Sequence, residues 1–113
     1  PVYLKKDLSL HGRAQEIYIR AGNIIEDMIV EIIKTDPTPV AQKGEPVFFP
    51  RRTPEEGNIA DLDSLEKIYD YIRMLDAEGY PNAFLETGNI RFEFSNAGLD
   101  DDGLSARVLI KKK

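Results

Sequence analysis

A short stretch of the chain combines two kinds of side chain that together can bind a planar, charged ligand. Phe48 and Phe49 are followed, after one proline, by Arg51 and Arg52. A guanidinium group can donate two parallel hydrogen bonds to a phosphate or a carboxylate, and an aromatic face can stack on a base or a sugar. The sequence therefore predicts a substrate-binding site at Phe48, Arg51 and Arg52.

The same stretch also has a structural interpretation. Either arginine can form an ion pair with Glu55 or Glu56, which follow within a few residues, and both phenylalanines can dock in a hydrophobic core. Short Arg–Glu spacings are common on protein surfaces, where an exposed ion pair contributes only about 0–1 kcal/mol. The sequence alone leaves both interpretations open.

No set of residues in the chain has the composition of a catalytic centre or a metal site. His11 is the only histidine and cysteine is absent, whereas a catalytic histidine needs an orienting partner. Asp100–Asp102 lacks the spaced oxygen ligands of a calcium loop and is expected to form a solvated hairpin turn. The sequence thus predicts no catalytic residue, no metal ligand and a structural or exposed role for His11.

Length and composition narrow the class of protein. The 113 residues are 42% hydrophobic and 31% charged, as in an ordinary globular domain. No apolar run reaches the roughly 20 residues of a membrane span, and no basic-then-apolar signal opens the chain. We expect a cytoplasmic protein without a membrane partner. The net charge of −5 argues against extensive contact with nucleic acid, because each phosphate contact normally uses a lysine or arginine.

The first part of the chain predicts a strand and a long helix. Residues 2–10 have strand character, and residues 13–35 repeat apolar side chains at helical spacing. Such a wide isoleucine-rich stripe needs a large partner, such as a sheet, to cover it. Its members are Ile17, Ala21, Ile24, Ile25, Met28, Ile29, Ile32 and Ile33.

The rest predicts an extended linker, a helix and an antiparallel meander. Residues 36–60 contain five prolines and two glycines, which disfavour regular structure. Asp63 with Glu66 suggests a capping box that starts a second helix, with Tyr69 in the core and Tyr71 at a contact surface. Alternating residues in 83–87, 90–95 and 104–110 predict three strands with one apolar face, formed in the last strand by Leu104, Ala106, Val108 and Ile110.

Three motifs in order resemble those of formyltransferases that use 10-formyltetrahydrofolate, a family that includes methionyl-tRNA formyltransferases and sugar N-formyltransferases. The motifs are FFPRRTPEEG at Phe48–Gly57, IYDYIRML at Ile68–Leu75 and YPNAF at Tyr80–Phe84. The opening Pro-Val-Tyr also looks like the family segment that follows an Asp-(Thr/Ala)-Gly motif. One departure is Pro81–Asn82–Ala83, where the family usually has Pro-Gly-Ala.

The resemblance implies a fold and a division of the chain. The family's catalytic Asn, His and Asp do not occur here, so the chain is expected to be a non-catalytic C-terminal portion. Residues 1–36 would be the edge of a Rossmann-like catalytic domain, residues 37–60 a linker, and residues 61–113 a helix with a small β region. The expected class is thus α/β, and the expected partner is an upstream catalytic domain of the same protein.

The resemblance also implies a donor and a choice of acceptors. The parent enzyme would use 10-formyltetrahydrofolate, which this segment alone would not bind. Because the chain is acidic, we expect an amino sugar linked to a nucleotide as the acceptor rather than tRNA. The alternatives are a segment of a methionyl-tRNA formyltransferase and a stand-alone, non-catalytic module whose helix and meander serve homo-oligomerisation.

Overall fold

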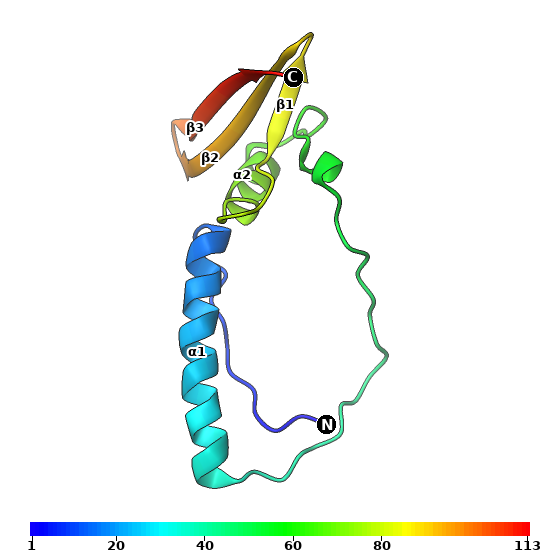
Figure 1. Cartoon of the computed structure of the whole chain (residues 1–113), viewed down its shortest axis with the longest axis vertical. Coiled ribbons are helices and arrows are strands. Elements are labelled where there is room, and N and C mark those ends of the chain that lie inside the picture. Colours follow the sequence, from blue (N-terminus) through cyan, green and yellow to red (C-terminus); the bar gives the residue numbers. More distant parts are fainter. The chain divides into compact units, whose positions relative to one another are not determined.

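The computed structural model describes all of residues 1–113 and divides into two compact units. Unit 1 comprises residues 1–11 and 16–51, and unit 2 comprises residues 12–15 and 52–113. The elements follow in the order α1, η1, α2, β1, β2 and β3 (Figure 1). The expected α/β class is confirmed, with two α-helices and a three-stranded antiparallel sheet. The three-part division at residues 36 and 60 stays a prediction.

Helix α1 spans Ala14–Thr35, close to the predicted range. Glu16 lies in its first turn and Lys34 in its last, where each charge complements the helix dipole. The helix ends at Asp36, which has a positive φ of 42°, directly before Pro37. Its apolar residues lie on more than one side. Ile17 is buried, whereas a second set stays exposed: Tyr18, Ile25, Ile29 and Ile33.

The strand predicted at residues 2–10 is not formed, and this prediction was wrong. The segment makes one isolated bridge, between Val2 and Val40, with backbone hydrogen bonds of 2.6 and 2.8 Å. Side chains of α1 hold the rest of the segment. Arg20 donates to the carbonyl oxygens of Ser9 and His11, and Lys6 forms an ion pair with Glu31 at 2.8 Å. A strand needs a continuous neighbour for its backbone groups, and unit 1 supplies a single bridge.

The predicted linker is extended and irregular up to a short 3₁₀ helix, η1, at Pro54–Gly57. The Glu56 carboxylate accepts a hydrogen bond from the Thr53 backbone N–H and fixes the start of this turn. Gly57 is buried, and a Cβ atom there would lie 3.3 Å from Leu75 Cδ1 and 3.7 Å from Phe84 Cδ1. The close approach of these side chains explains why the turn ends in glycine.

Helix α2 spans Leu65–Met74. Its N-cap is Ser64, whose side chain accepts a hydrogen bond from the Lys67 backbone N–H at 3.2 Å. The predicted cap at Asp63 was therefore displaced by one residue. Asp63 instead forms an ion pair with the Lys67 ammonium group at 2.9 Å. Both Asp and Ser satisfy the open N–H groups of a first turn, so residue type alone did not distinguish them.

The three strands form a sheet of order β1-β2-β3, with both pairs antiparallel. Strand β1 spans Phe84–Thr87, β2 spans Ile90–Asp100, and β3 spans Gly103–Lys112. A register shift between Ser95 and Gly98 interrupts the β2–β3 pairing. The acidic residues 100–102 form the turn between β2 and β3, as predicted.

Helix α2 and the sheet enclose the core of unit 2. Its buried centre consists of Ile59, Ile72 and Ala83, and the half-buried residues packed on it are Leu62, Ile68, Tyr71, Leu75, Leu85, Phe94, Ala97, Leu104 and Ala106. Tyr71 rather than Tyr69 joins this core, against the prediction. Val108 and Ile110 are 42% and 59% exposed, so the predicted apolar face is only partly covered. A helix of 10 residues is too short to cover β3 to its end.

Candidate functional site

Phe48 and Arg51 belong to unit 1 and lie on its surface. Phe48 and Phe49 are each 86% exposed, so the phenylalanines do not dock in a core. Arg51 is exposed as well. The structural interpretation of the two aromatic residues is therefore wrong, and their faces are available to a ligand.

Arg52 belongs to unit 2 and is held by that unit. Its guanidinium carbon lies 5.1 Å from the centroid of the Tyr71 ring, within the range of a cation–π interaction. The same group donates a hydrogen bond to the backbone carbonyl of Glu56 at 3.4 Å. The alternative interpretation, an ion pair of Arg52 with the Glu55 or Glu56 carboxylate, does not occur. Arg52 thus connects the end of the linker to α2.

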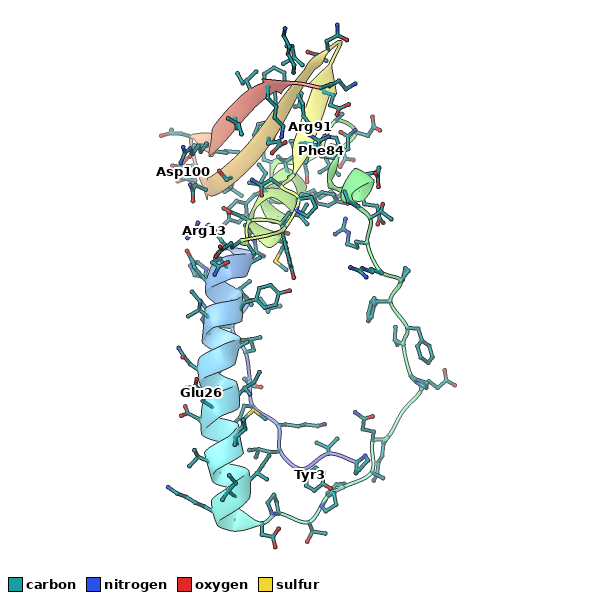
Figure 2. All side chains as sticks on the ribbon, in the orientation of Figure 1. Tyr3, Arg13, Glu26, Phe84, Arg91 and Asp100 are labelled. Atoms are coloured by element: carbon teal, nitrogen blue, oxygen red, sulfur yellow. The ribbon has the colours of Figure 1, made fainter.

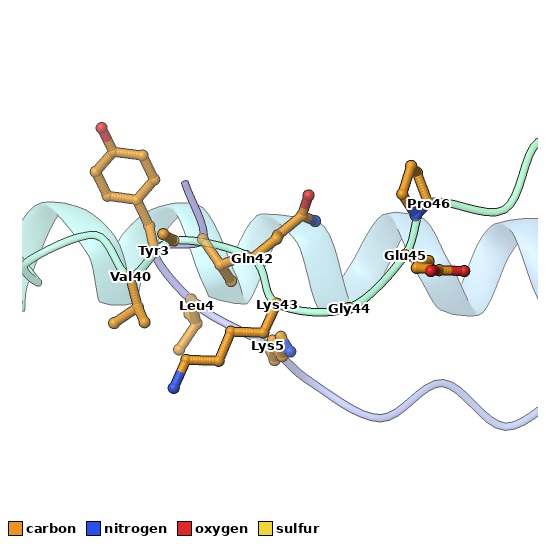
Figure 3. Close-up of a pocket in the computed structure, with 11 residues that line it drawn as sticks. Tyr3, Leu4, Lys5, Val40, Gln42, Lys43, Gly44, Glu45 and Pro46 are labelled. Carbon is orange, nitrogen blue, oxygen red and sulfur yellow. The ribbon is translucent and has the colours of Figure 1, made fainter.

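An open trough in unit 1 lies between the N-terminal segment and the start of the linker. It has a volume of about 890 Å³ and is lined by residues 2–5 and 40–46 (Figure 3). Lys5 and Lys43 contribute cations to its lining, and Glu45 contributes one anion. Gly44 has a positive φ of 99° and turns the linker at this place. The trough is open to solvent and carries a net positive lining.

A network of charged side chains links the strands of unit 2. Arg91 lies 3.0 Å from Glu86 and 3.4 Å from Glu93, and Lys111 also contacts Glu93. Lys113 lies 2.8 Å from Glu86. The hydrogen bond from Lys113, reinforced by Arg91, lowers the pKa of the Glu86 carboxyl. These contacts join β1, β2 and the residues at the end of β3.

The Arg91 side chain also packs on an aromatic ring. Its guanidinium carbon lies 3.7 Å from the centroid of Phe84, and Figure 2 shows the two labelled side chains together at the sheet. The Arg91 Nε atom is buried without a hydrogen-bond partner, although the Glu93 carboxylate is within ion-pair distance. Sequence analysis missed this network. Part of it could have been found in the sequence. A two-residue turn at residues 88–89 sets the register of the two strands and places Glu86 opposite Arg91.

The other charged candidates do not assemble into a site. His11 is exposed, and its backbone N–H donates to the Ser9 hydroxyl at 3.4 Å. In the β2–β3 turn, the Asp102 backbone N–H donates to Asp100 Oδ1 at 2.9 Å. No group of three or more His, Cys, Asp or Glu side chains is arranged to hold a metal ion. None of the helices is both long and apolar enough to cross a bilayer.

Comparisons with known proteins agree on one family. Residues 54–111, more than half of the chain, match the family model described as methionyl-tRNA formyltransferase, C-terminal domain. A solved structure of methionyl-tRNA formyltransferase from Clostridium thermocellum is 48% identical, with a TM-score of 0.92 over 98% of this chain. The chain spans 49% of that protein's chain. No curated protein matches. The chain belongs to the formyltransferase family and corresponds to its methionyl-tRNA formyltransferase C-terminal portion.

Proposed function

We propose that this chain is the C-terminal portion of an enzyme that transfers a formyl group from 10-formyltetrahydrofolate to the amino group of methionyl-tRNA. The observation that carries the proposal is the 48% identity to a methionyl-tRNA formyltransferase over 98% of the chain. This similarity extends through both units, because it includes α1 and the linker as well as the sheet. In the proposed reaction, the amine of the acceptor attacks the formyl carbon of the donor. The bond from that carbon to the donor nitrogen then breaks, and tetrahydrofolate leaves with the proton that the amine gives up.

The acceptor proposed here differs from the one that net charge favoured. An amino sugar linked to a nucleotide was preferred because the chain carries a charge of −5. The similarities favour the alternative, a tRNA. Net charge is a weak guide to the acceptor because it averages over the whole chain, whereas phosphate contacts depend on local cations. Residues 46–52 contain two arginines and no acidic residue.

In this proposal the chain itself performs no chemistry. The Asn, His and Asp that the family resemblance implies, and the folate site, would be supplied by an upstream catalytic domain. Phe48 and Arg51 would contact the acceptor, since both are exposed. Arg52 would act indirectly by holding the linker end on Tyr71. The Rossmann-like assignment of residues 1–36 belongs to the same proposal.

A competition assay tests the choice of acceptor. The protein encoded by the complete reading frame that contains this chain is supplied with 10-formyltetrahydrofolate and either methionyl-tRNA or a nucleotide-linked amino sugar. We expect formyl-methionyl-tRNA to be the product. Arg51→Ala should raise the KM for methionyl-tRNA and leave kcat unchanged, because it removes binding common to the ground and transition states. Exclusive formylation of the amino sugar would reject the proposal.

A further inference from the structure

We infer that the linker surface of unit 1 binds single-stranded nucleic acid, with Phe48 and Phe49 stacking on unpaired bases and Arg51, Lys43 and Lys5 facing phosphates. The inference rests on the proposed tRNA acceptor and specifies which part of it this surface contacts. Every tRNA ends in an unpaired 3′ strand, and that strand has the chemistry that this surface fits.

The linker presents two adjacent aromatic side chains to solvent. Phe48 and Phe49 are each 86% exposed, and Val47 beside them is 74% exposed. Residues 45–50 belong to no helix or strand, so neither ring is tied into regular structure. Pro46 and Pro50 enclose the three residues and restrict the backbone on either side. The rings are therefore presented to solvent by a segment of limited freedom, which reduces the entropy lost on binding.

Cationic side chains lie on both sides of the two rings along the chain. Arg51 follows Phe49 after one proline and is exposed as well. On the other side of Val47, the linker leads directly from the trough in which Lys5 and Lys43 face solvent. Glu45 is the one acidic residue from 40 to 51. A cationic groove that continues into exposed aromatic rings is the arrangement that binds single strands without sequence preference.

A double helix fits this surface poorly. In a duplex the base faces are already stacked on one another, so Phe48 and Phe49 would find no ring to cover. A duplex would then contact only the cations, and the acidic remainder of the chain would oppose it. Unpaired nucleotides can turn their bases toward aromatic side chains. A surface with two exposed rings and a few cations should therefore bind single-stranded nucleic acid in preference to a duplex.

Arg52 is not part of this surface. Its guanidinium group is engaged by the Tyr71 ring and the Glu56 carbonyl of unit 2. The proposed surface is therefore not simply every cation of the linker. Removing Arg52 should alter the stability of unit 2, whereas removing Arg51 should alter only the binding of the strand.

The test compares leucine and tryptophan at the two aromatic positions in the complete protein. Phe48→Leu with Phe49→Leu keeps apolar side chains and removes stacking; Phe48→Trp with Phe49→Trp keeps stacking. Affinity is measured by fluorescence anisotropy for a labelled single-stranded RNA octanucleotide and for an RNA duplex of equal length. We expect the leucine pair to weaken single-strand binding roughly tenfold or more and the tryptophan pair to retain it. Val47→Ala is the matched control and should bind like the parent protein.

Two further readouts distinguish this inference from the proposed function. Arg51→Ala should reduce the slope of log K against log salt by about 0.7 for the single strand. In the formylation assay, the leucine pair should raise the KM for methionyl-tRNA roughly tenfold at unchanged kcat. Unchanged octanucleotide affinity in the leucine pair would overturn the inference even if methionyl-tRNA is formylated. Octanucleotide binding that needs the rings, in a protein that does not formylate methionyl-tRNA, would support this surface and reject only the proposed reaction.

Discussion

Arg51 and Arg52 are neighbours in the sequence, yet their guanidinium groups have different surroundings. Arg51 is exposed on unit 1, and Arg52 lies over the Tyr71 ring of unit 2. An arginine held against a ring has already lost much of its rotamer freedom and some of its hydration. Both arginines are exposed, but Arg51 has no such ring contact, so it retains its rotamer freedom and hydration for a phosphate. We therefore propose a binding role for Arg51 and a positioning role for Arg52.

This difference predicts that two alanine substitutions change the free energy of unfolding by different amounts. Arg52→Ala removes the cation–π contact and the hydrogen bond to the Glu56 carbonyl, and should lower the free energy of unfolding by about 1 kcal/mol. Arg51→Ala should change it by less than about 0.5 kcal/mol. Urea unfolding followed by circular dichroism measures both values. Equal destabilisation by the two substitutions would contradict the assignment.

From the sequence, residues 48–52 were predicted to bind a ligand, and this stays a prediction. The sequence could not predict the partner of Arg52. Glu55 and Glu56 were the nearest carboxylates along the chain, and they were considered first for that reason. The partner that forms is the Tyr71 ring, which α2 brings to this place through the tertiary fold. A contact between residues that are far apart in the sequence cannot be predicted from the spacing of neighbouring residues.

At the scale of the element, the start of α2 gives a prediction with an internal control. Ser64 caps the helix through its side chain, so Ser64→Ala should lower the free energy of unfolding by about 1 kcal/mol. Asp63→Ala removes only an ion pair whose aspartate side chain is 79% exposed, and should cost about 0.5 kcal/mol or less. Thermal and urea unfolding of both variants would check this. A larger loss of unfolding free energy in Asp63→Ala than in Ser64→Ala would show that Asp63, not Ser64, caps the helix.

The charge network across the strands makes the stability of the sheet depend on pH. The pKa of Glu86 is lowered in the folded chain, first by the hydrogen bond from Lys113 and then by Arg91. A lowered folded-state pKa means that the carboxylate stabilises the fold above its unfolded-state pKa. That contribution is lost as the pH falls through the folded-state value.

Glu86→Gln should therefore be less stable than the parent chain at neutral pH and equally stable in strong acid. Urea midpoints measured at about pH 7 and about pH 2 would show whether the difference disappears on acidification. Glu45→Gln is the matched control, because no ion pair or side-chain hydrogen bond involves Glu45. A difference that persists unchanged at the lower pH would mean that the substitution acts through packing rather than charge.

Elements with their own periodic pattern were predicted more accurately than elements that depend on a partner. Helix α1 and strands β1 and β3 lie close to their predicted ranges, and α2 starts close to its predicted cap. Strand β2 begins where predicted but continues past residue 95 to Asp100. Residues 2–10 share the apolar alternation of a strand, but unit 1 pairs them only at Val2. Alternation describes which residues would face a core, whereas a strand exists only when a neighbour takes up its backbone hydrogen bonds.

At the scale of the whole molecule, α1 carries more apolar surface than its own unit covers. Tyr18, Ile25, Ile29 and Ile33 are each more than half exposed, and they recur at helical spacing along one stripe. An exposed apolar stripe of this kind marks a contact surface. The chain spans 49% of the similar formyltransferase. The proposed function implies that an upstream domain covers this stripe.

The stripe predicts how residues 1–113 behave when they are expressed alone. Ile25 and Ile29 would then face water, and copies of the chain should associate through them to remove that surface. Ile25→Glu with Ile29→Glu places two like charges on the stripe and should shift the population to monomers, as measured by light scattering after gel filtration. Asn23→Glu adds charge to an exposed polar position of the same helix and should leave association unchanged. A parent chain that is already a stable monomer would contradict this prediction, because it would show that the exposed stripe of α1 does not drive association.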